Sequence, residues 1–222
     1  GTFDPVHNGH IDIIARAEDD FLVAQGMHKG AMALIDEARA EKVYQAMGPA
    51  VESSGGSAAN TIVGVASFGG QVAFVGKVKD DVLGRAFTHD IRAARVAFDT
   101  KPASDGPSTA RCYIMVTPDG ERTMNTYLGA AQDLKPSDID EASVSSAAVV
   151  YLEGYLWDPP QAKEAFVKAS VIAHKAGRKV ALTLSDSFCV DRYRGEFIDL
   201  IRKGTVDIVF ANEGELKSLY ET

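Results

Sequence analysis

The last third of the chain alternates apolar extended runs with helical patterns, and this order constrains the fold more than any other feature of the sequence. Each apolar run is short enough for a buried strand, and the segments between the runs have apolar residues at helical spacing. A repeating strand–helix order predicts a mostly parallel sheet covered by helices, which is an α/β fold. The expected strands span residues 149–152, 179–184 and 206–210, and the expected helices span 160–176, 194–202 and a segment from Asn212.

The first two thirds of the chain are expected to be mixed in structure. Residues 111–116 and 121–127 are rich in β-forming side chains, and a Thr-Pro-Asp-Gly sequence joins them. Proline presets one turn angle and glycine permits another, so these two segments predict a β-hairpin. Further strands are expected near residues 11–15, 31–35 and 71–76, and further helices at 37–47, from Ser57 onward and at 82–94.

Composition favours a soluble enzyme domain. With 222 residues the chain is long enough for one large α/β domain. The net charge is −8 and the basic residues are dispersed, so we expect no nucleic-acid partner. The sequence has no signal peptide and no apolar stretch long enough to span a bilayer, so we expect no membrane partner and a cytoplasmic location. Cys112 and Cys189 lack metal-ligand spacing, which predicts reduced thiols and no zinc site.

The junction at residues 54–61 carries the strongest local sign of a ligand site. It places two adjacent glycines, Gly55 and Gly56, directly before a segment with helical spacing. Glycine lets the backbone approach a ligand closely, and the first N–H groups of a helix point outward as donors. Asn60 adds both a donor and an acceptor one turn into the helix. Such a junction can hold a polyhydroxylated ligand, although the same pattern also occurs as a plain turn before a helix.

Four segments, in this order, resemble the ribokinase and adenosine-kinase (PfkB-type) family of small-molecule kinases, with the adenosine-kinase branch favoured. The resemblance implies a three-layer, ribokinase-like α/β fold in which helices cover both faces of a mostly parallel sheet, with a small β lid added. It also implies one domain over residues 1–222, with lid segments at 28–36 and 97–130 and with the C-terminal part of the fold missing. The matching segments are SGGSAANTIVGVASFGGQVAFVGKVKDDVLG (54–84), LEGYLWDPP (152–160), TLSDSF (183–188) and VDIVFANEGE (206–215).

The family resemblance implies a sugar-binding clamp near the start of the chain. Asp12 is similar to the early acidic residue that accepts hydrogen bonds from sugar hydroxyls, with Gly55, Gly56 and Asn60 completing the clamp. Ser57 is expected beside the ligand. The alternatives are a solvent-facing aspartate near a strand start for Asp12, and a simple helix cap for Ser57.

Further substrate contacts are implied where the strands end. Loops at the carboxyl ends of parallel strands share one edge of the sheet, and this is where ligands bind in such folds. Glu153 is expected to bind ribose there, with a strand-end charge in water as the alternative. Tyr155 is expected to face the base, with core packing as the alternative. Met32 and Leu34, in the lid-like strand, are weaker candidates for contact with the base.

The family resemblance also implies magnesium and ATP as cosubstrate. Asn212 and Glu215 stand in the family's Asn-x-x-Glu arrangement, which is expected to influence magnesium and phosphate through ordered water. The alternative is a reciprocal helix cap, since Asn is a good N-cap and Glu three residues later completes the capping box. Lys77, Lys79 and Arg122 are dispersed basic residues and receive no role.

The first ten residues, GTFDPVHNGH, resemble a different signature, that of nucleotidyltransferases of the adenylyltransferase type. In that family the paired histidines stabilise charge on the nucleotide phosphates, which would be the role of His7 and His10. The spacing of Asn8 and Asp12 also fits the first strand of the kinase family, so the two interpretations overlap. A nucleotidyltransferase is therefore an alternative function.

The function implied by the kinase resemblance is ATP-dependent phosphoryl transfer to the primary hydroxyl of a nucleoside or sugar, with adenosine favoured. The family's Gly-Ala-Gly-Asp motif, which carries the catalytic aspartate, is not found in the sequence, so no catalytic residue is assigned and this chain is expected to have little or no activity. A noncatalytic nucleoside-binding or dimerisation module is a third hypothesis. The expected partners are a nucleoside or sugar substrate and a second copy of the chain, paired through the β lid.

Overall fold

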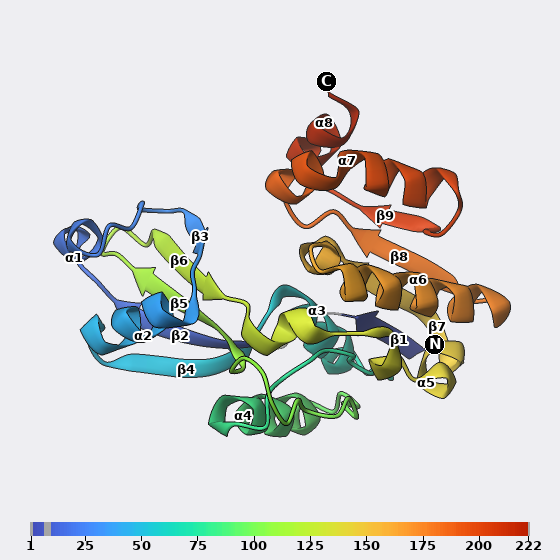
Figure 1. Cartoon of the computed structure of the whole chain (residues 1–222), viewed down its shortest axis with the longest axis horizontal. Coiled ribbons are helices and arrows are strands. Elements are labelled where there is room, and N and C mark those ends of the chain that lie inside the picture. The colour runs from blue at the N-terminus through green and yellow to red at the C-terminus, as the bar shows by residue number, and fades with distance from the viewer. Residues whose placement is uncertain (1, 7–9, 222) are drawn as a thin grey trace.

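A computed structural model describes residues 2–6 and 10–221, which form two sheets side by side (Figure 1). The first sheet has four strands in the order β1-β7-β8-β9, and every neighbouring pair is parallel. This arrangement confirms the α/β fold expected from the strand–helix order. The strands are β1 (Thr2–Val6), β7 (Ala147–Glu153), β8 (Lys179–Thr183) and β9 (Ile208–Phe210).

Alternate residues of the strands point to opposite sides of the four-stranded sheet, so each face has apolar side chains to bury, and helices cover both faces. Val150 and Leu152 lie in one buried cluster, together with side chains of the helices of the C-terminal half. Tyr151, between them in sequence, belongs to a second cluster that includes the apolar residues of α3 (Ser57–Ser67). The helices of the first cluster are α5 (Glu141–Ser146), α6 (Pro160–Lys175), α7 (Ser187–Arg202) and α8 (Glu213–Tyr220).

The second sheet has five strands in the order β3-β6-β5-β2-β4 and is mixed in direction. The β2–β5 and β3–β6 pairs are parallel, whereas β5–β6 and β2–β4 are antiparallel. One face of this sheet packs on two helices in a common core, α1 (Asp19–Ala24) and α2 (Glu37–Ala46). The strands are β2 (His10–Arg16), β3 (Met32–Leu34), β4 (Ala50–Gly55), β5 (Ala110–Val116) and β6 (Arg122–Tyr127).

The predicted hairpin is confirmed as β5 and β6. Its turn is closed by a hydrogen bond from the Thr117 backbone N–H to the Glu121 carbonyl, and Gly120 has a φ of 86°. That positive angle is one that glycine adopts without steric cost. The hairpin lies in the five-stranded sheet with β3, and the assignment of residues 28–36 and 97–130 to a lid within one domain stays a prediction.

Two predicted elements differ from the structure. Residues 71–76 do not form a strand, because they make only isolated contacts such as the bridge between Ala73 and Ala97, without a ladder of paired residues. Helix α7 begins at Ser187, where the Asp186 side chain accepts a hydrogen bond from the Cys189 N–H, but Tyr193 has non-helical backbone angles, and the predicted helix from Arg194 is the part of α7 after this kink. Four observed elements, β1, α1, β4 and α5, are not predicted from the sequence.

Two further observations concern the helices and the cysteines of the described residues. None of the helices within 2–6 and 10–221 combines the length and apolar character needed to cross a membrane. Cys112 and Cys189 are both buried and form no disulfide, in agreement with the expected reduced thiols.

Candidate functional site

The face of the five-stranded sheet that does not pack on α1 and α2 carries Asp12, and we call it the open face. In the register, Asp12 pairs with Cys112 of β5 and with Ser53 of β4. Cys112 in turn pairs with Thr126, and Thr126 with Leu34. Paired residues share a face of a sheet, so these five side chains form one row across it. Asp12 is the third residue of β2 and its side chain is 20 % exposed, so it is partly covered and not freely solvated.

A second row on the open face is wholly apolar. Ile14 pairs with Ile114 and Val51, Ile114 pairs with Met124, and Met124 pairs with Met32. Met32 and Val51 are 43 % and 67 % exposed, so this surface is not covered by the rest of the chain. The open face thus places one carboxylate beside exposed apolar surface, which suits a ligand with hydroxyl groups on one side and a flat apolar group on the other.

Sequence reasoning placed Met32 and Leu34 here but missed Cys112, Met124 and Thr126. These three belong to the hairpin, whose strands alternate between the two faces of the sheet. The alternation itself was readable from the sequence. What was missing was the pairing of β2 with β5, which joins segments about 100 residues apart and sets which hairpin face lies beside Asp12.

The Asp12 carboxylate is positioned by its two neighbours on the paired strands β2 and β4. His10 Nε2 lies 3.1 Å from Asp12 Oδ1. On the adjacent strand, a Cβ atom added to Gly55 would lie 2.1 Å from Asp12 Oδ2, well inside contact distance. The carboxylate therefore occupies space that exists only because residue 55 is glycine. The expected close approach of the paired glycines to a ligand stays a prediction.

Gly56 turns the chain from β4 into α3, with φ of 107° and ψ of 136°. It is the N-cap residue, and no side chain of the described part of the chain caps this helix end. The backbone N–H groups of the first turn are therefore oriented as donors. Ser57 and Asn60 are both exposed in this first turn, and the Asn60 N–H bonds to the Gly56 carbonyl at 2.8 Å. The simple capping alternative for Ser57 is not the arrangement seen.

The clamp residues lie at the carboxyl end of β1. Gly55 pairs with His10, which follows the end of β1 by four residues in the sequence. β1 runs parallel to β7, with Val6 opposite Leu152, so Glu153 stands at the same edge of the sheet. Glu153 is only 2 % exposed and is therefore not a strand-end charge in water.

Tyr155 is held firmly at the neighbouring strand end. Its hydroxyl donates to the Ser185 carbonyl at 3.1 Å, and its backbone N–H donates to Ser185 Oγ at 3.2 Å. Burial raises the pKa of Tyr155, and the nearby carboxylates of Asp186 and Glu215 raise it further. The parallel order of β7, β8 and β9 sets the residues that follow these strands along one edge of the sheet.

Asn212 and Glu215 form the reciprocal cap that was weighed as an alternative. The Glu215 N–H donates to Asn212 Oδ1 at 2.9 Å, while Asn212 N and Nδ2 donate to the two Glu215 oxygens at 3.1 and 2.7 Å. Direct metal coordination would disrupt this cap, but the remaining carboxylate lone pairs can bind water, so the pair fits an indirect role with magnesium. Within the described residues no three His, Cys, Asp or Glu side chains cluster as a metal site.

The structure thus brings Asp12, Gly55, Gly56, Ser57 and Asn60 to one junction and sets the strand-end residues along the adjoining sheet edge. His7 lies outside the described residues. His10 belongs to β2 and contacts Asp12.

Comparison with known proteins identifies the family to which the chain is similar. The profile of the family described as pfkB family carbohydrate kinase matches residues 31–222. A second profile, described as cytidylyltransferase-like, matches residues 1–23.

Solved structures similar to this chain include the adenosine kinase of Sinorhizobium meliloti, at 59 % identity and a TM-score of 0.92 over 99 % of this chain and 67 % of that one. A probable sugar kinase from Rhizobium etli CFN 42 matches at 57 % identity and a TM-score of 0.93, with the same coverage. Among curated proteins, probable fructokinase-6 (chloroplastic) of Arabidopsis thaliana is 28 % identical over 74 % of this chain and 46 % of its own length. The chain spans about half the length of the curated relatives it matches.

Proposed function

The chain belongs to the pfkB family of carbohydrate kinases, and on this premise we propose that residues 1–222 supply the substrate-binding part of a kinase that transfers the γ-phosphoryl group of ATP to the primary hydroxyl of a nucleoside, with adenosine as the favoured substrate. One observation carries the choice of a nucleoside: the carboxylate of Asp12 lies on the open face beside the wholly apolar row that contains Ile14 and Ile114. The similarity to an adenosine kinase at 59 % identity supports the same choice.

In the proposed complex Asp12 accepts hydrogen bonds from two neighbouring ribose hydroxyls. Hydrogen bonds to a charged group contribute about 1.5–3 kcal/mol each, so this carboxylate supplies much of the binding energy and its direction. The exposed amide of Asn60 and the first N–H groups of α3 bind the same sugar from the other side. Glu153 contacts the ribose from the end of β7, and Tyr155 borders the base.

The apolar surface of the open face is proposed to contact the base. Met32 and Leu34 are 43 % and 51 % exposed, and Cys112 and Met124 lie between them and the β2 strand in the register. A purine ring laid on these side chains would cover apolar area that is now in water, which stabilises the complex by about 25 cal/mol per Å².

Magnesium and ATP are proposed from the family. Asn212 and Glu215 would act through ordered water, and the metal would neutralise charge on the phosphates when bound. The residues of this chain hold the acceptor and exclude water from it, but the sequence contains no Gly-Ala-Gly-Asp segment to supply a base. We therefore propose that residues 1–222 bind the nucleoside with little or no turnover.

Calorimetry and a coupled assay of ADP formation test this function together. We expect adenosine to bind, ribose and fructose to bind more weakly, and Asn60→Ala to abolish adenosine binding. Robust ADP formation by residues 1–222 would contradict the proposed lack of turnover. Failure of all three compounds to bind would contradict the site. Binding of adenosine also by a longer form of the protein, still without turnover, would favour a noncatalytic nucleoside-binding module.

A nucleotidyltransferase is the second candidate, supported by the cytidylyltransferase-like match over residues 1–23. His10, the one histidine of the pair that the structure describes, already contacts Asp12 at 3.1 Å. Pyrophosphate release from ATP that disappears in His10→Ala would favour this candidate over the kinase.

Residues 28–36 and 97–130, which include β3, β5 and β6 of the five-stranded sheet, are proposed to act as a lid on the four-stranded sheet within one domain of residues 1–222. The exposed apolar residues of the five-stranded sheet, such as Val51 at 67 %, also offer a surface on which a second copy could pair. Light scattering tests the pairing: we expect a dimer that Val51→Asp dissociates, and a monomer at all concentrations would refute it. A cytoplasmic location is proposed from the family's ATP-dependent chemistry and can be tested by fractionation.

A further inference from the structure

A cavity of about 630 Å³ lies along α4 (Val82–Ala93) and shares no residue with the candidate site. In Figure 1, α4 runs below the two sheets. The cavity is a groove between one side of this helix and the segments around residues 79–80 and 100–102. Its size is in the range of small-molecule sites.

The groove is basic although the chain is acidic. Lys79, Arg85 and Arg92 line it against a single carboxylate, Asp80, whereas the whole chain has a net charge of −8. Residues 85, 88, 89 and 92 lie at helical spacing on one side of α4, so the two arginines, Thr88 and His89 present their polar groups along the same groove. This concentration of positive charge favours an anion.

The arginines keep donors for a ligand. Arg85 makes one ion pair, from Nη1 to Asp80 at 2.8 Å, and both side chains are about 60 % exposed. An exposed pair of this kind contributes little, so an anion can replace Asp80 at small cost. Arg92 donates Nε and Nη2 to the Phe98 carbonyl at 3.0 and 2.5 Å, and its Nη2 also lies 3.5 Å from Oδ1 of the exposed Asp99, which leaves Nη1 for a ligand.

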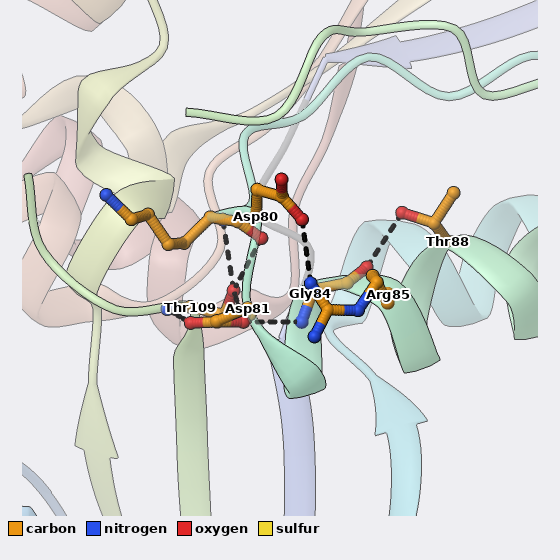
Figure 2. A network of polar contacts seen from close by, with 7 residues as sticks. Asp80, Asp81, Gly84, Arg85, Thr88 and Thr109 are labelled. Carbon is orange, nitrogen blue, oxygen red and sulfur yellow. Dashed lines mark hydrogen bonds and ion pairs between the residues drawn. The ribbon is translucent and has the colours of Figure 1, made fainter. Parts of the chain in front are cut away.

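The wall of the groove is fixed without any ligand, as Figure 2 shows. Asp81 accepts hydrogen bonds from the Gly84 N–H and from Thr109 Oγ1, both at 2.7 Å, and from the Thr109 N–H at 2.8 Å. The turn is also tightly packed, because a Cβ atom on Gly84 would lie 1.9 Å from the Lys79 carbonyl oxygen. A pre-formed groove of this kind loses little conformational entropy when it binds a ligand.

The remaining lining is largely apolar and includes Ala93 and Pro102. Phosphate alone would leave this surface unused, whereas a phosphate joined to a ring would contact both parts. We propose that the α4 groove is a second binding site, distinct from the substrate site, for a phosphomonoester of a sugar or nucleoside. The phosphate is bound by Arg85 and Arg92, and the ring lies on the apolar lining.

Nuclear magnetic resonance titration of the isotope-labelled chain locates the binding directly. Ribose 5-phosphate and adenosine 5′-monophosphate are the probes, and adenosine is the uncharged control. We expect at least one phosphorylated probe to shift the amide signals of Thr88, His89 and Thr100, and adenosine to leave them unchanged. If only the nucleotide shifts them, the base is required, and if both do, the sugar phosphate is sufficient.

Variants assign the shifts to the arginines. Arg85→Gln with Arg92→Gln is expected to weaken binding at the groove at least about tenfold, since charge-assisted bonds to phosphate are lost. Asp80→Asn removes the competing carboxylate and is expected to strengthen it. Asp12→Asn and the distant, exposed Arg202→Gln are expected to leave the groove unchanged.

The proposal is overturned if neither probe shifts the groove signals at millimolar concentration, if adenosine shifts them equally, or if the double arginine variant, with its other signals intact, binds as the wild type does. Because Asp12→Asn affects only the substrate site, failure of the groove proposal is distinguishable from failure of the proposed kinase function.

Discussion

Replacement of Gly55 by alanine tests whether the Asp12 carboxylate is placed by the absence of a neighbouring side chain. The new Cβ atom would lie 2.1 Å from Asp12 Oδ2 and 2.8 Å from its Cγ. Both distances are too short for real contacts, so the carboxylate must rotate away. Since it is the end of a flexible side chain and not backbone, the fold can accommodate the change, and we expect the free energy of unfolding to fall by less than about 1 kcal/mol.

Ligand binding should change far more than stability. A displaced carboxylate loses its hydrogen bonds to the sugar hydroxyls, and a hydrogen bond to a charged group contributes about 1.5–3 kcal/mol. The dissociation constant for adenosine should therefore rise roughly 10- to 150-fold in Gly55→Ala.

Calorimetry with adenosine and urea denaturation measure the two effects on the same protein. Gly64→Ala in α3 is the matched control, because a Cβ atom there meets nothing within 4 Å. It should bind adenosine normally and be more stable by about 0.5–1 kcal/mol. Gly55→Ala protein with wild-type affinity for adenosine would refute the reasoning.

Three further changes have expected outcomes. Gly84→Ala should destabilise the protein by about 2–3 kcal/mol in urea denaturation, since its Cβ atom would meet the Lys79 backbone oxygen at 1.9 Å, and stability equal to that of Gly64→Ala would contradict this close packing. Burial alone would raise the pKa of Asp207, but hydrogen bonds from the Val180 N–H, His174 and Lys179 lower it from 3.8 to about 2. The resulting stabilisation is present above about pH 4 and is lost as the pH falls through about 2. In Asp207→Asn the free energy of unfolding should therefore fall less steeply between pH 4 and pH 2 than in the wild type. An equally steep fall in the variant would disprove the assignment. Burial raises the pKa of Cys112 to about 11 and that of Cys189 to about 12, so iodoacetamide at pH 8 should alkylate the native protein much more slowly than the urea-unfolded protein; equal rates would show that the thiols are accessible.

The sequence contained most of the information about the parallel sheet because each of its strand–helix units is local. The apolar run at residues 149–152, the proline start of α6 at Pro160 and the Asn212 cap of α8 lie within or at the ends of the observed elements. The strand predicted at residues 71–76 is wrong because this segment, although buried like a strand, makes only isolated β-bridges. Burial can be read from one segment, whereas a ladder depends on a partner elsewhere in the chain.

The candidate site shows the same difference between local sequence signals and pairing of distant segments. Gly55, Gly56 and Asn60 could be proposed from the sequence alone because they belong to one local junction between a strand and a helix. The companions of Asp12 on the open face, Cys112 and Thr126, depend on the pairing of β2 with β5, which no local pattern specifies. The sequence pattern of Asn212 and Glu215 predicts either a reciprocal helix cap or an indirect role with magnesium. The structure shows the capping contacts, and these are compatible with a further role through water.

The most direct test of the central claim compares adenosine with 2′-deoxyadenosine by calorimetry in the wild-type chain and in Asp12→Ala. If Asp12 binds the two neighbouring ribose hydroxyls, the wild type should bind adenosine at least about tenfold more tightly than the deoxy compound, because one hydrogen bond to a charged group is lost. In Asp12→Ala that preference should shrink to nearly none. An equal preference in both proteins, or none in the wild type, would contradict the proposed sugar clamp.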